Sequence, residues 1–312
     1  MTHPLLAVAN LYIHRGRTAA VRDVSFEVSP GSVFGLIGPD GAGKSTLLSS
    51  LATLVEPSAG SIHVCGISVQ ERPAEALSHL GFMPDQGELQ EDLRVREFLE
   101  LFASAHAIPR AERGARIDEI LEQMGLTDVS KAPVGKLNLP MRKRVVLAKT
   151  LLHDPRVLLL DEPAAGLEAE GRDELTRTLR TLGQAGKAIV VSSSVLDEME
   201  TFCTHVGILD AGSLALSGRT ADVLEGLRPG RSIRLSLVHP DGRLQRFLAE
   251  QPNVKDVEAD HESAQFHLDG GLQEAAGLLR RLVESDFELA HFAAQEGGLG
   301  DILAQVHGDE PG

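Results

Sequence analysis

The chain has 312 residues, a length that suggests about two domains, each able to bury a hydrophobic core. Its 45 Asp and Glu residues exceed its 30 Lys and Arg residues, and the net charge of −15 argues against a nucleic-acid-binding surface, which needs a basic footprint. No apolar run approaches the roughly 20 residues of a membrane span, and no signal peptide opens the chain. We therefore expect any membrane association to come through a partner.

The N-terminal part of the chain is expected to be rich in strands. Residues 5–12, 20–28 and 61–65 are β-like segments separated by Gly/Arg and Pro/Gly turns, and they predict an antiparallel sheet beside an α/β core. The two cysteines, Cys65 and Cys203, lack the spacing of metal ligands and lie in apolar strand and helix patterns. We interpret them as core thiols in a reducing cytosol.

One segment predicts a phosphate-binding loop. It matches the pattern G-x-x-x-x-G-K-[ST] and consists of Gly38, Pro39, Asp40, Gly41, Ala42, Gly43, Lys44, Ser45 and Thr46. A short apolar strand (32–37) precedes it and a helix with regularly spaced leucines (44–55) follows it, which is the context that the pattern requires. Its glycines allow backbone N–H groups and the helix N-terminus to point at a polyphosphate. Lys44 is expected to reach the β- and γ-phosphates, and the Ser45 hydroxyl is expected to hold Mg²⁺.

The middle of the chain is predicted to be helical and then to return to α/β alternation. Residues 93–136 carry two apolar stripes at helical spacing and are expected to form an inserted helical subdomain, followed by a helix over 141–153. The unbroken apolar run that ends at Asp161 and Glu162 predicts a parallel strand buried on both faces. The next expected elements are a helix and two strands, at 170–182, 188–192 and 206–210.

A second domain is expected after a composition shift at residues 228–230. The predicted division is therefore 1–226 and 230–312, with the helical subdomain at about 88–150. The second domain carries a β-α-β-β-α-β pattern, which predicts a small ferredoxin-like unit. Its expected elements are 232–237, 244–250, 254–259, 264–268, 272–284 and 287–292, followed by an amphipathic helix at about 299–306. His261, His267 and His291 lack ligand spacing and are interpreted as surface or strand-face residues.

With these motifs in order, the first 220 or so residues resemble the ATP-binding subunit of ABC transporters. The tail resembles the accessory domain of the drug- and polysaccharide-exporter branch. The resemblance implies an α/β P-loop NTPase core with an antiparallel β flank and an inserted helical subdomain, plus a small α+β ferredoxin-like C-terminal domain. It also implies an integral-membrane permease on a separate chain, a second ATP-binding subunit in a homo- or heterodimer, and a cytoplasmic position on the inner face of the cell membrane through the permease.

The resemblance assigns roles to individual residues. ATP and Mg²⁺ are the implied ligands, with Asp161 joining Ser45 in holding Mg²⁺ or its water ligand. Glu162 matches the general base that activates the attacking water. Arg15 takes the place of the aromatic residue that stacks on adenine, and a guanidinium plane can also stack on a base. Tyr12 is interpreted as a packing residue.

Four elements of the family's catalytic shell are substituted. Asp85 stands where a glutamine is expected; a carboxylate can still bind Mg²⁺ but cannot donate a hydrogen bond to the water. Asn138, Leu139 and Pro140 replace the Ser-Gly-Gly of the signature motif, although proline is acceptable at a helix start. The other two substitutions are Glu168 for an aspartate and Ser194 for a histidine.

We therefore expect an ATP-binding subunit of an ABC-type exporter that binds Mg-ATP but hydrolyses it slowly. Two alternatives stay open: a fully active transport ATPase, and a nucleotide-sensing regulatory protein with no transport role. A DNA-repair ATPase of the same superfamily is disfavoured by the negative charge and the lack of a long heptad insert. We further expect residues 81–97 to dock the permease, with core packing of Phe82 and Met83 as the alternative.

Overall fold

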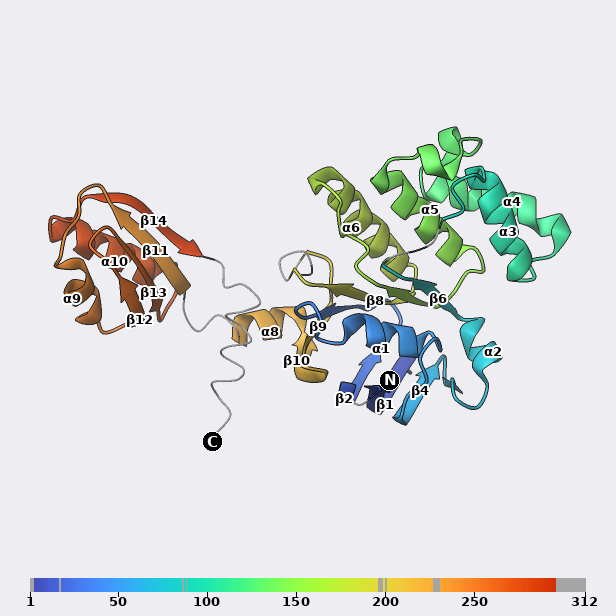
Figure 1. Ribbon diagram of the computed structural model, residues 1–312, viewed down its shortest axis with the longest axis horizontal. Coiled ribbons are helices and arrows are strands. Elements are labelled where there is room, and N and C mark those ends of the chain that lie inside the picture. The colour runs from blue at the N-terminus through green and yellow to red at the C-terminus, as the bar shows by residue number, and fades with distance from the viewer. Residues whose placement is uncertain are drawn as a thin grey trace. The chain divides into compact units, whose positions relative to one another are not determined.

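The structure is a computed structural model that describes residues 3–16, 18–85, 87, 89–195, 199, 201–226 and 231–295. The chain divides into two compact units, Met1–Thr220 and Ala221–Gly312 (Figure 1). The boundary expected at 226–230 lies on the C-terminal side of this division, after helix α8 (Thr220–Gly226). The helix expected at 299–306 lies outside the described residues.

The first unit contains an antiparallel sheet with the strand order β2-β1-β4-β5. The strands are β1 (Leu6–Arg15), β2 (Thr18–Val28), β4 (Ala59–Val64) and β5 (Ile67–Ser68). This sheet confirms the antiparallel flank predicted from the sequence. The last residue of β1, Arg15, pairs with Thr18 at the turn into β2, so both residues lie at one end of the sheet.

A six-stranded sheet forms the centre of the first unit, with the order β10-β9-β3-β8-β7-β6. Its strands pair in parallel except for β10, which runs antiparallel to β9. They are β3 (Val33–Ile37), β6 (Leu80–Met83), β7 (Val157–Leu160), β8 (Ala188–Ser193), β9 (His205–Asp210) and β10 (Ser213–Arg219). Strands β3, β7, β8 and β9 were predicted from the sequence, whereas the two edge strands, β6 and β10, were not.

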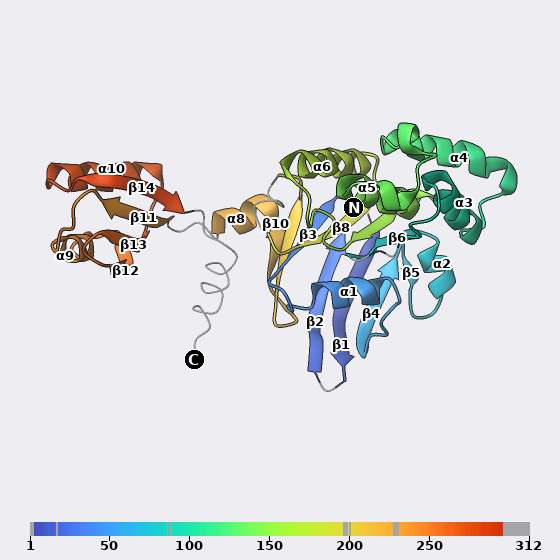
Figure 2. The ribbon, with the colours of Figure 1, turned by 45° about the horizontal axis from the view of Figure 1, so that its top comes forward.

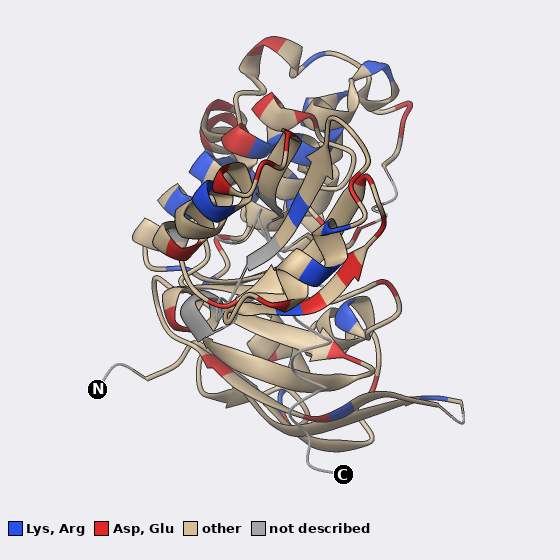
Figure 3. Cartoon of the chain, turned by 90° about the vertical axis from the view of Figure 1, so that its left-hand side faces the viewer, with Lys and Arg blue, Asp and Glu red and all other residues tan. Residues whose placement is uncertain are grey.

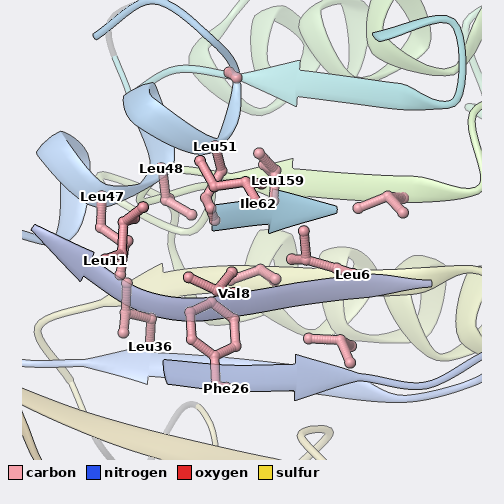
Figure 4. Close-up of a cluster of buried hydrophobic side chains, with 14 of the residues drawn as sticks. Leu6, Val8, Leu11, Phe26, Leu36, Leu47, Leu48, Leu51, Ile62 and Leu159 are labelled. Carbon is pink, nitrogen blue, oxygen red and sulfur yellow. The ribbon is translucent and has the colours of Figure 1, made fainter. Parts of the chain in front are cut away.

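Helix α1 (Lys44–Leu51) packs together with both sheets in one hydrophobic cluster. Leu47, Leu48 and Leu51 of α1 lie among side chains of β1, β4 and β7, as Figure 4 shows. The rings of Phe26 in β2 and Phe34 in β3 stack with their centroids 4.7 Å apart, which joins the two sheets directly. This packing fixes the point at which the chain leaves β3 and enters α1.

Three helices gather beside the β6 edge of the six-stranded sheet, as Figures 1 and 2 both show. They are α3 (Val95–Ala105), α4 (Arg110–Gln123) and α5 (Leu139–Leu151). The expected helical stretch at 93–136 therefore contains two helices, and it ends in two 3₁₀ turns, Thr127–Val129 and Val134–Lys136. Two further helices of this unit are the short α2 (Pro73–Leu77), which the sequence pattern did not predict, and α6 (Ala169–Gln184).

Charged positions of both signs are spread over the helices and loops, whereas the strands are mostly uncharged (Figure 3). Within the described residues, none of the helices combines the length and the apolar character that crossing a membrane requires.

Cys203 is buried in the segment before β9, outside the helix pattern in which the sequence placed it, and Cys65 is half-buried in the turn after β4. Both are free thiols whose pKa is raised by burial.

Residues 231–295 of the second unit form a four-stranded antiparallel sheet with two helices packed against it (Figure 2). The elements are β11 (Arg231–Leu237), α9 (Leu244–Ala249), β12 (Val254–Ala259), β13 (Ser263–Leu268), α10 (Leu272–Glu284) and β14 (Leu289–Gln295). The strand order β12-β13-β11-β14 and the antiparallel pairing are those of the predicted ferredoxin-like unit.

Candidate functional site

The loop between β3 and α1 has a backbone that only glycine fits at two places. A Cβ on Gly38 would lie 2.2 Å from the carbonyl oxygen of Leu209, and a Cβ on Gly43 would lie 2.4 Å from that of Ala20. Gly43 also has a φ of 108° and immediately precedes the first residue of α1. The loop is therefore pressed against its neighbours, and its backbone N–H groups lead into a helix N-terminus, which is the arrangement of a phosphate cradle.

Lys44, the first residue of α1, folds back beneath this loop. Its Nζ donates hydrogen bonds to the carbonyl oxygens of Gly38, at 2.7 Å, and Pro39, at 3.3 Å. The same nitrogen lies 3.4 Å from Oε1 of Glu162, and the side chain is only 6% exposed. The lysine therefore links the loop to the residue that follows β7.

The loop borders a cavity of about 750 Å³ in the first unit. The cavity brings together residues that are far apart in the sequence: Arg15 at the end of β1, Asp85 after β6, Glu162 after β7 and Ser194 after β8. Its lining consists of Arg15, Thr18, Ala19, Ala20, Arg22, Pro39, Asp40, Gly41, Gly43, Lys44, Ser45, Thr46, Asp85, Glu162, Ala165, Ser194, Ala211 and Gly212. The other candidates, Gly38, Ala42 and Asp161, are buried and lie outside this lining.

Asp161 and Glu162 are connected through one serine of the neighbouring strand. The hydroxyl of Ser192 in β8 donates to Oδ1 of Asp161 at 2.6 Å and accepts from the backbone N–H of Glu162 at 2.8 Å. Ser192 is completely buried and Asp161 is 3% exposed. The role of Ser192 was not predicted from the sequence, because it depends on the pairing of β7 with β8.

Glu162 combines an unusual backbone with a shielded carboxylate. Its φ of 45° lies in the left-handed region, which non-glycine residues seldom adopt. Burial raises the pKa of the Glu162 carboxyl, while the nearby Lys44 ammonium acts in the opposite direction. A carboxylate with a raised pKa that faces a polar cavity suits a general base.

A second lysine, which no sequence motif predicted, approaches the same turn from α5. Lys143 Nζ donates to the backbone carbonyl oxygen of Glu162 at 3.0 Å and lies 4.0 Å from Oδ1 of Asp85. Burial lowers the pKa of Lys143, and the carboxylates of Asp85, Glu162 and Asp161 oppose that shift. Lys143 therefore joins the Asp85 segment to the turn after β7.

The segment at the start of α5 is organised as a capped helix end. Asn138 is the N-cap, and its Oδ1 accepts the backbone N–H of Met141 at 3.0 Å. Proline occupies one of the first two helical positions, as the sequence predicted. The Leu139 side chain is 44% exposed, and its Cδ2 lies 2.8 Å from where a Cβ on Gly166 would be.

The loop after β7 ends at the start of α6, where Glu168 is the N-cap residue. Gly166 within this loop has a φ of 74°. Ala165 from the same loop and Ser194 from the end of β8 both line the cavity. Two of the substituted residues therefore belong to this region: Glu168 stands at the N-cap position of α6 without a side-chain capping hydrogen bond, and Ser194 faces the cavity.

The segment at 81–97 is divided between core and surface. Met83 is 2% exposed within β6, and Phe82 packs against the hydrophobic cluster, so both side chains follow the core-packing alternative. Arg94, the residue before α3, is exposed. Arg96 Nη1 lies 2.6 Å from Oδ1 of Asp118 in α4, so its charge is already paired.

Comparison with known proteins identifies the family. The ABC transporter family model matches residues 21–165. The daunorubicin resistance ATP-binding protein DrrA3 of Streptomyces coeruleorubidus is 31% identical over 296 residues, which cover 95% of this chain and 93% of that protein. A Nod factor export ATP-binding protein I of Burkholderia thailandensis is 36% identical over 205 residues, which cover 66% of this chain and 67% of that protein.

Solved structures agree with the sequence comparison. A part of the cbiONQ ABC transporter complex from Clostridium perfringens has a TM-score of 0.66 at 25% identity, covering 72% of this chain and 93% of that chain. Another structure, described as the ATP-binding subunit of an ABC transporter, has a TM-score of 0.65 at 27% identity, covering 71% of this chain and 92% of that chain. The chain therefore belongs to the ABC transporter family and is one of its ATP-binding subunits.

Proposed function

We propose that the chain binds Mg-ATP in the cavity beside the glycine loop and hydrolyses it slowly, as the ATP-binding subunit of an exporter. The observation that carries this proposal is the pairing, in one cavity, of a complete phosphate cradle with substituted catalytic positions. Lys44 and Ser45 stand beside the loop in this cavity, and so do Asp85 and Ser194. Arg15, at the cavity's edge on β1, offers a guanidinium plane for the adenine base.

The oxygen ligands around the loop fit Mg²⁺. Ser45 supplies a hydroxyl, and Asp85 supplies a carboxylate that lines the cavity. Asp161 is held in place behind them by Ser192. Among the described residues, no three His, Cys, Asp or Glu side chains form a metal-binding cluster of their own. This suits Mg²⁺, which proteins usually hold through one or two carboxylates together with substrate phosphates. Bound Mg²⁺ would neutralise charge on the phosphates.

Slow hydrolysis follows from what the substituted side chains can offer. Catalysis of phosphoryl transfer is mostly positioning and charge stabilisation, so it depends on hydrogen-bond donors aimed at the γ-phosphate. Asp85 has no proton to donate when it is ionised, and the Ser194 hydroxyl is shorter than the imidazole of the expected histidine. Pro140 removes a backbone N–H from the start of α5, and the Asn138 side chain is engaged in capping. Each of these losses weakens stabilisation of the transferring phosphate.

Two partners belong to this proposal: an integral-membrane permease on a separate chain and a second ATP-binding subunit. The printed names of two relatives concern daunorubicin resistance and Nod factor export, and these support the exporter assignment. In a dimer, each nucleotide would contact the glycine loop of one chain and the start of α5 of the other. The permease would hold the chain at the inner face of the membrane and would contact the exposed part of 81–97, around Arg94.

Nucleotide binding is the first test. Lys44→Ala removes the ammonium that is expected to face the β- and γ-phosphates, so Mg-ATP affinity should fall at least about tenfold by calorimetry. Lys131→Ala, at an exposed lysine of the same unit, is the matched control and should bind Mg-ATP like the wild type. Equal affinities for wild type and Lys44→Ala would contradict the proposed site. The rate of phosphate release by the wild-type protein tests the proposed slow hydrolysis.

A further inference from the structure

An unusual concentration of charge lies at the wall of the nucleotide cavity. Three carboxylates, those of Asp85, Asp161 and Glu162, act electrostatically on the ammonium of Lys143. The Lys143 side chain is 14% exposed, and its Nζ lies 4.0 Å from Asp85 Oδ1. Lys143 does not line the nucleotide cavity but lines a neighbouring cavity of about 260 Å³. It therefore approaches these carboxylates from outside the nucleotide cavity.

We propose that Lys143 is a built-in counter-ion of the nucleotide site, one that lets the site accept ATP without Mg²⁺ and that competes with Mg²⁺ for Asp85. This inference rests on the proposed binding of Mg-ATP in the cavity. Lys143 contacts the turn after β7 and would act without touching the nucleotide, so we class it as a positioning residue.

The charge balance gives the physical reason. When the three carboxylates are ionised they contribute three negative charges, and Lys44 and Lys143 contribute two positive charges, which leaves these five groups with one net negative charge. Arg15, Arg22 and Asp40 also line the cavity and are the same in every variant compared below. Without Lys143 the excess becomes two, and it would repel Mg-free ATP more than Mg-ATP, whose metal ion carries compensating charge. Asp85 is 42% exposed, so water screens part of this repulsion.

Geometry makes Lys143 the cation suited to this role. Lys44 lies 3.4 Å from Glu162, but it also donates to two carbonyl oxygens of the glycine loop. Lys143 is held against the turn by its hydrogen bond to the Glu162 carbonyl oxygen at 3.0 Å, and its Nζ also lies 4.0 Å from Asp85 Oδ1. Its ammonium therefore lies beside the Asp85 carboxylate, which is also the proposed ligand of Mg²⁺.

The test measures ATP binding by calorimetry with Mg²⁺ and again with EDTA. Lys143→Met keeps an unbranched side chain that is one atom shorter and removes the ammonium. We expect Mg-free ATP to bind about tenfold more weakly to this variant and Mg-ATP to bind no more than about threefold more weakly. Lys149→Met is the matched control: this lysine is also half-buried on α5 but lies over the Phe102 ring, and neither affinity should change.

Asp85→Asn tests the same pair from the other side. It removes the carboxylate that Lys143 offsets, so Mg-free ATP should bind about threefold more tightly than to the wild type. Added to Lys143→Met, it should restore most of the lost Mg-free affinity. A second readout is Mn²⁺ bound in the presence of a non-hydrolysable ATP analogue, detected by electron paramagnetic resonance. Lys143→Met should bind this Mn²⁺ more tightly because the ammonium no longer competes for Asp85.

The outcomes separate the inference from the function on which it rests. If Lys143→Met weakens both forms of ATP equally, the lysine only supports the turn and the counter-ion role is wrong. If Lys143→Met does not fold, Asp85→Asn decides alone, and unchanged Mg-free affinity in that variant overturns the inference. If the wild type binds no ATP with Mg²⁺ present, the proposed function fails first and the counter-ion role fails with it.

Discussion

The glycine-loop side of the cavity differs in construction from the substituted side, a name used for Asp85 and Ser194, which line the cavity, together with the start of α5, which lies outside its lining. On the loop side, the binding groups are largely backbone, and close packing against Leu209 and Ala20 sets their positions. On the other side, function depends on single side chains at the ends of elements. Such side chains can change without disturbing the fold, and Asn138 still caps α5 where a signature serine is expected. Binding and turnover can therefore be lost separately.

The largest expected effect comes from rebuilding the substituted side. We combine Asp85→Gln, Asn138→Ser, Leu139→Gly, Pro140→Gly and Ser194→His in one chain. One donor to developing charge is typically worth about 2.7–4 kcal/mol, and such contributions need not add, so turnover should rise at least about tenfold. Steady-state phosphate release measures the rise, and thermal unfolding checks that the rebuilt helix start still folds. Ser194→His alone should change turnover less than about threefold, because the other donors are still missing. Equal rates for wild type and the rebuilt chain would contradict the contrast between the two sides.

A smaller effect tests how firmly the fold supports the carboxylates. Ser192→Ala removes hydrogen bonds to a buried carboxylate and to the Glu162 N–H, and should lower the free energy of unfolding by about 2 kcal/mol. Ser50→Ala is the matched control, since Ser50 Oγ is buried and has no hydrogen-bond partner among the described residues. It should be neutral or slightly stabilising. Denaturant unfolding compares the two variants, and equal destabilisation would mean that the Ser192 bridge contributes nothing.

The smallest effect concerns the far end of α5, which anchors the substituted side to the core. His153 Nε2 lies 3.0 Å from the Leu80 carbonyl oxygen, and the ring stacks on His106 with centroids 4.0 Å apart. Burial is the main cause that lowers the pKa of His153 from 6.5 to about 4, and the charge of the neighbouring His106 adds to this shift. A histidine with a lowered pKa contributes stability above the unfolded pKa and loses it as the pH falls towards the folded pKa.

We therefore expect the free energy of unfolding to fall between pH 7 and pH 5 because of His153. The whole pKa shift would correspond to a loss of about 2 kcal/mol in the free energy of unfolding over this range. Because the ring is partly exposed, we expect a loss of about 1 kcal/mol. His153→Gln keeps a donor for Leu80 but cannot become protonated. Denaturant unfolding at the two pH values should show the smaller loss in this variant, and identical losses would exclude His153 as the source.

Much of the fold follows from local sequence pattern. The glycine loop, the buried β7 and the β-α-β-β-α-β order each have a signal within one short segment. The edge strands β6 and β10 were overlooked because they are short or carry only a partial apolar pattern, and their pairing with distant strands defines them. Helix α2 has five residues, too few for a helical period to be visible.

The candidate site was predictable only where a motif names its residues. The phosphate-loop pattern supplied Lys44 and the family resemblance supplied Asp161 and Glu162, and the structure brings Lys44 within 3.4 Å of Glu162. Ser192 and Lys143 had no such signal, because each acts across a contact between elements that are remote in the chain. Glu162 itself gave no sequence sign of its left-handed backbone, which the turn after β7 imposes.

The central claim, that this chain binds ATP well and turns it over slowly, is tested most directly by steady-state phosphate release from the wild type and from Glu162→Gln, with saturating Mg-ATP. We expect a wild-type rate below about 0.1 s⁻¹ that changes little in the variant, because the missing donors rather than the base limit turnover. A wild-type rate of about 1 s⁻¹ or more that collapses in Glu162→Gln would identify a competent ATPase and contradict the account.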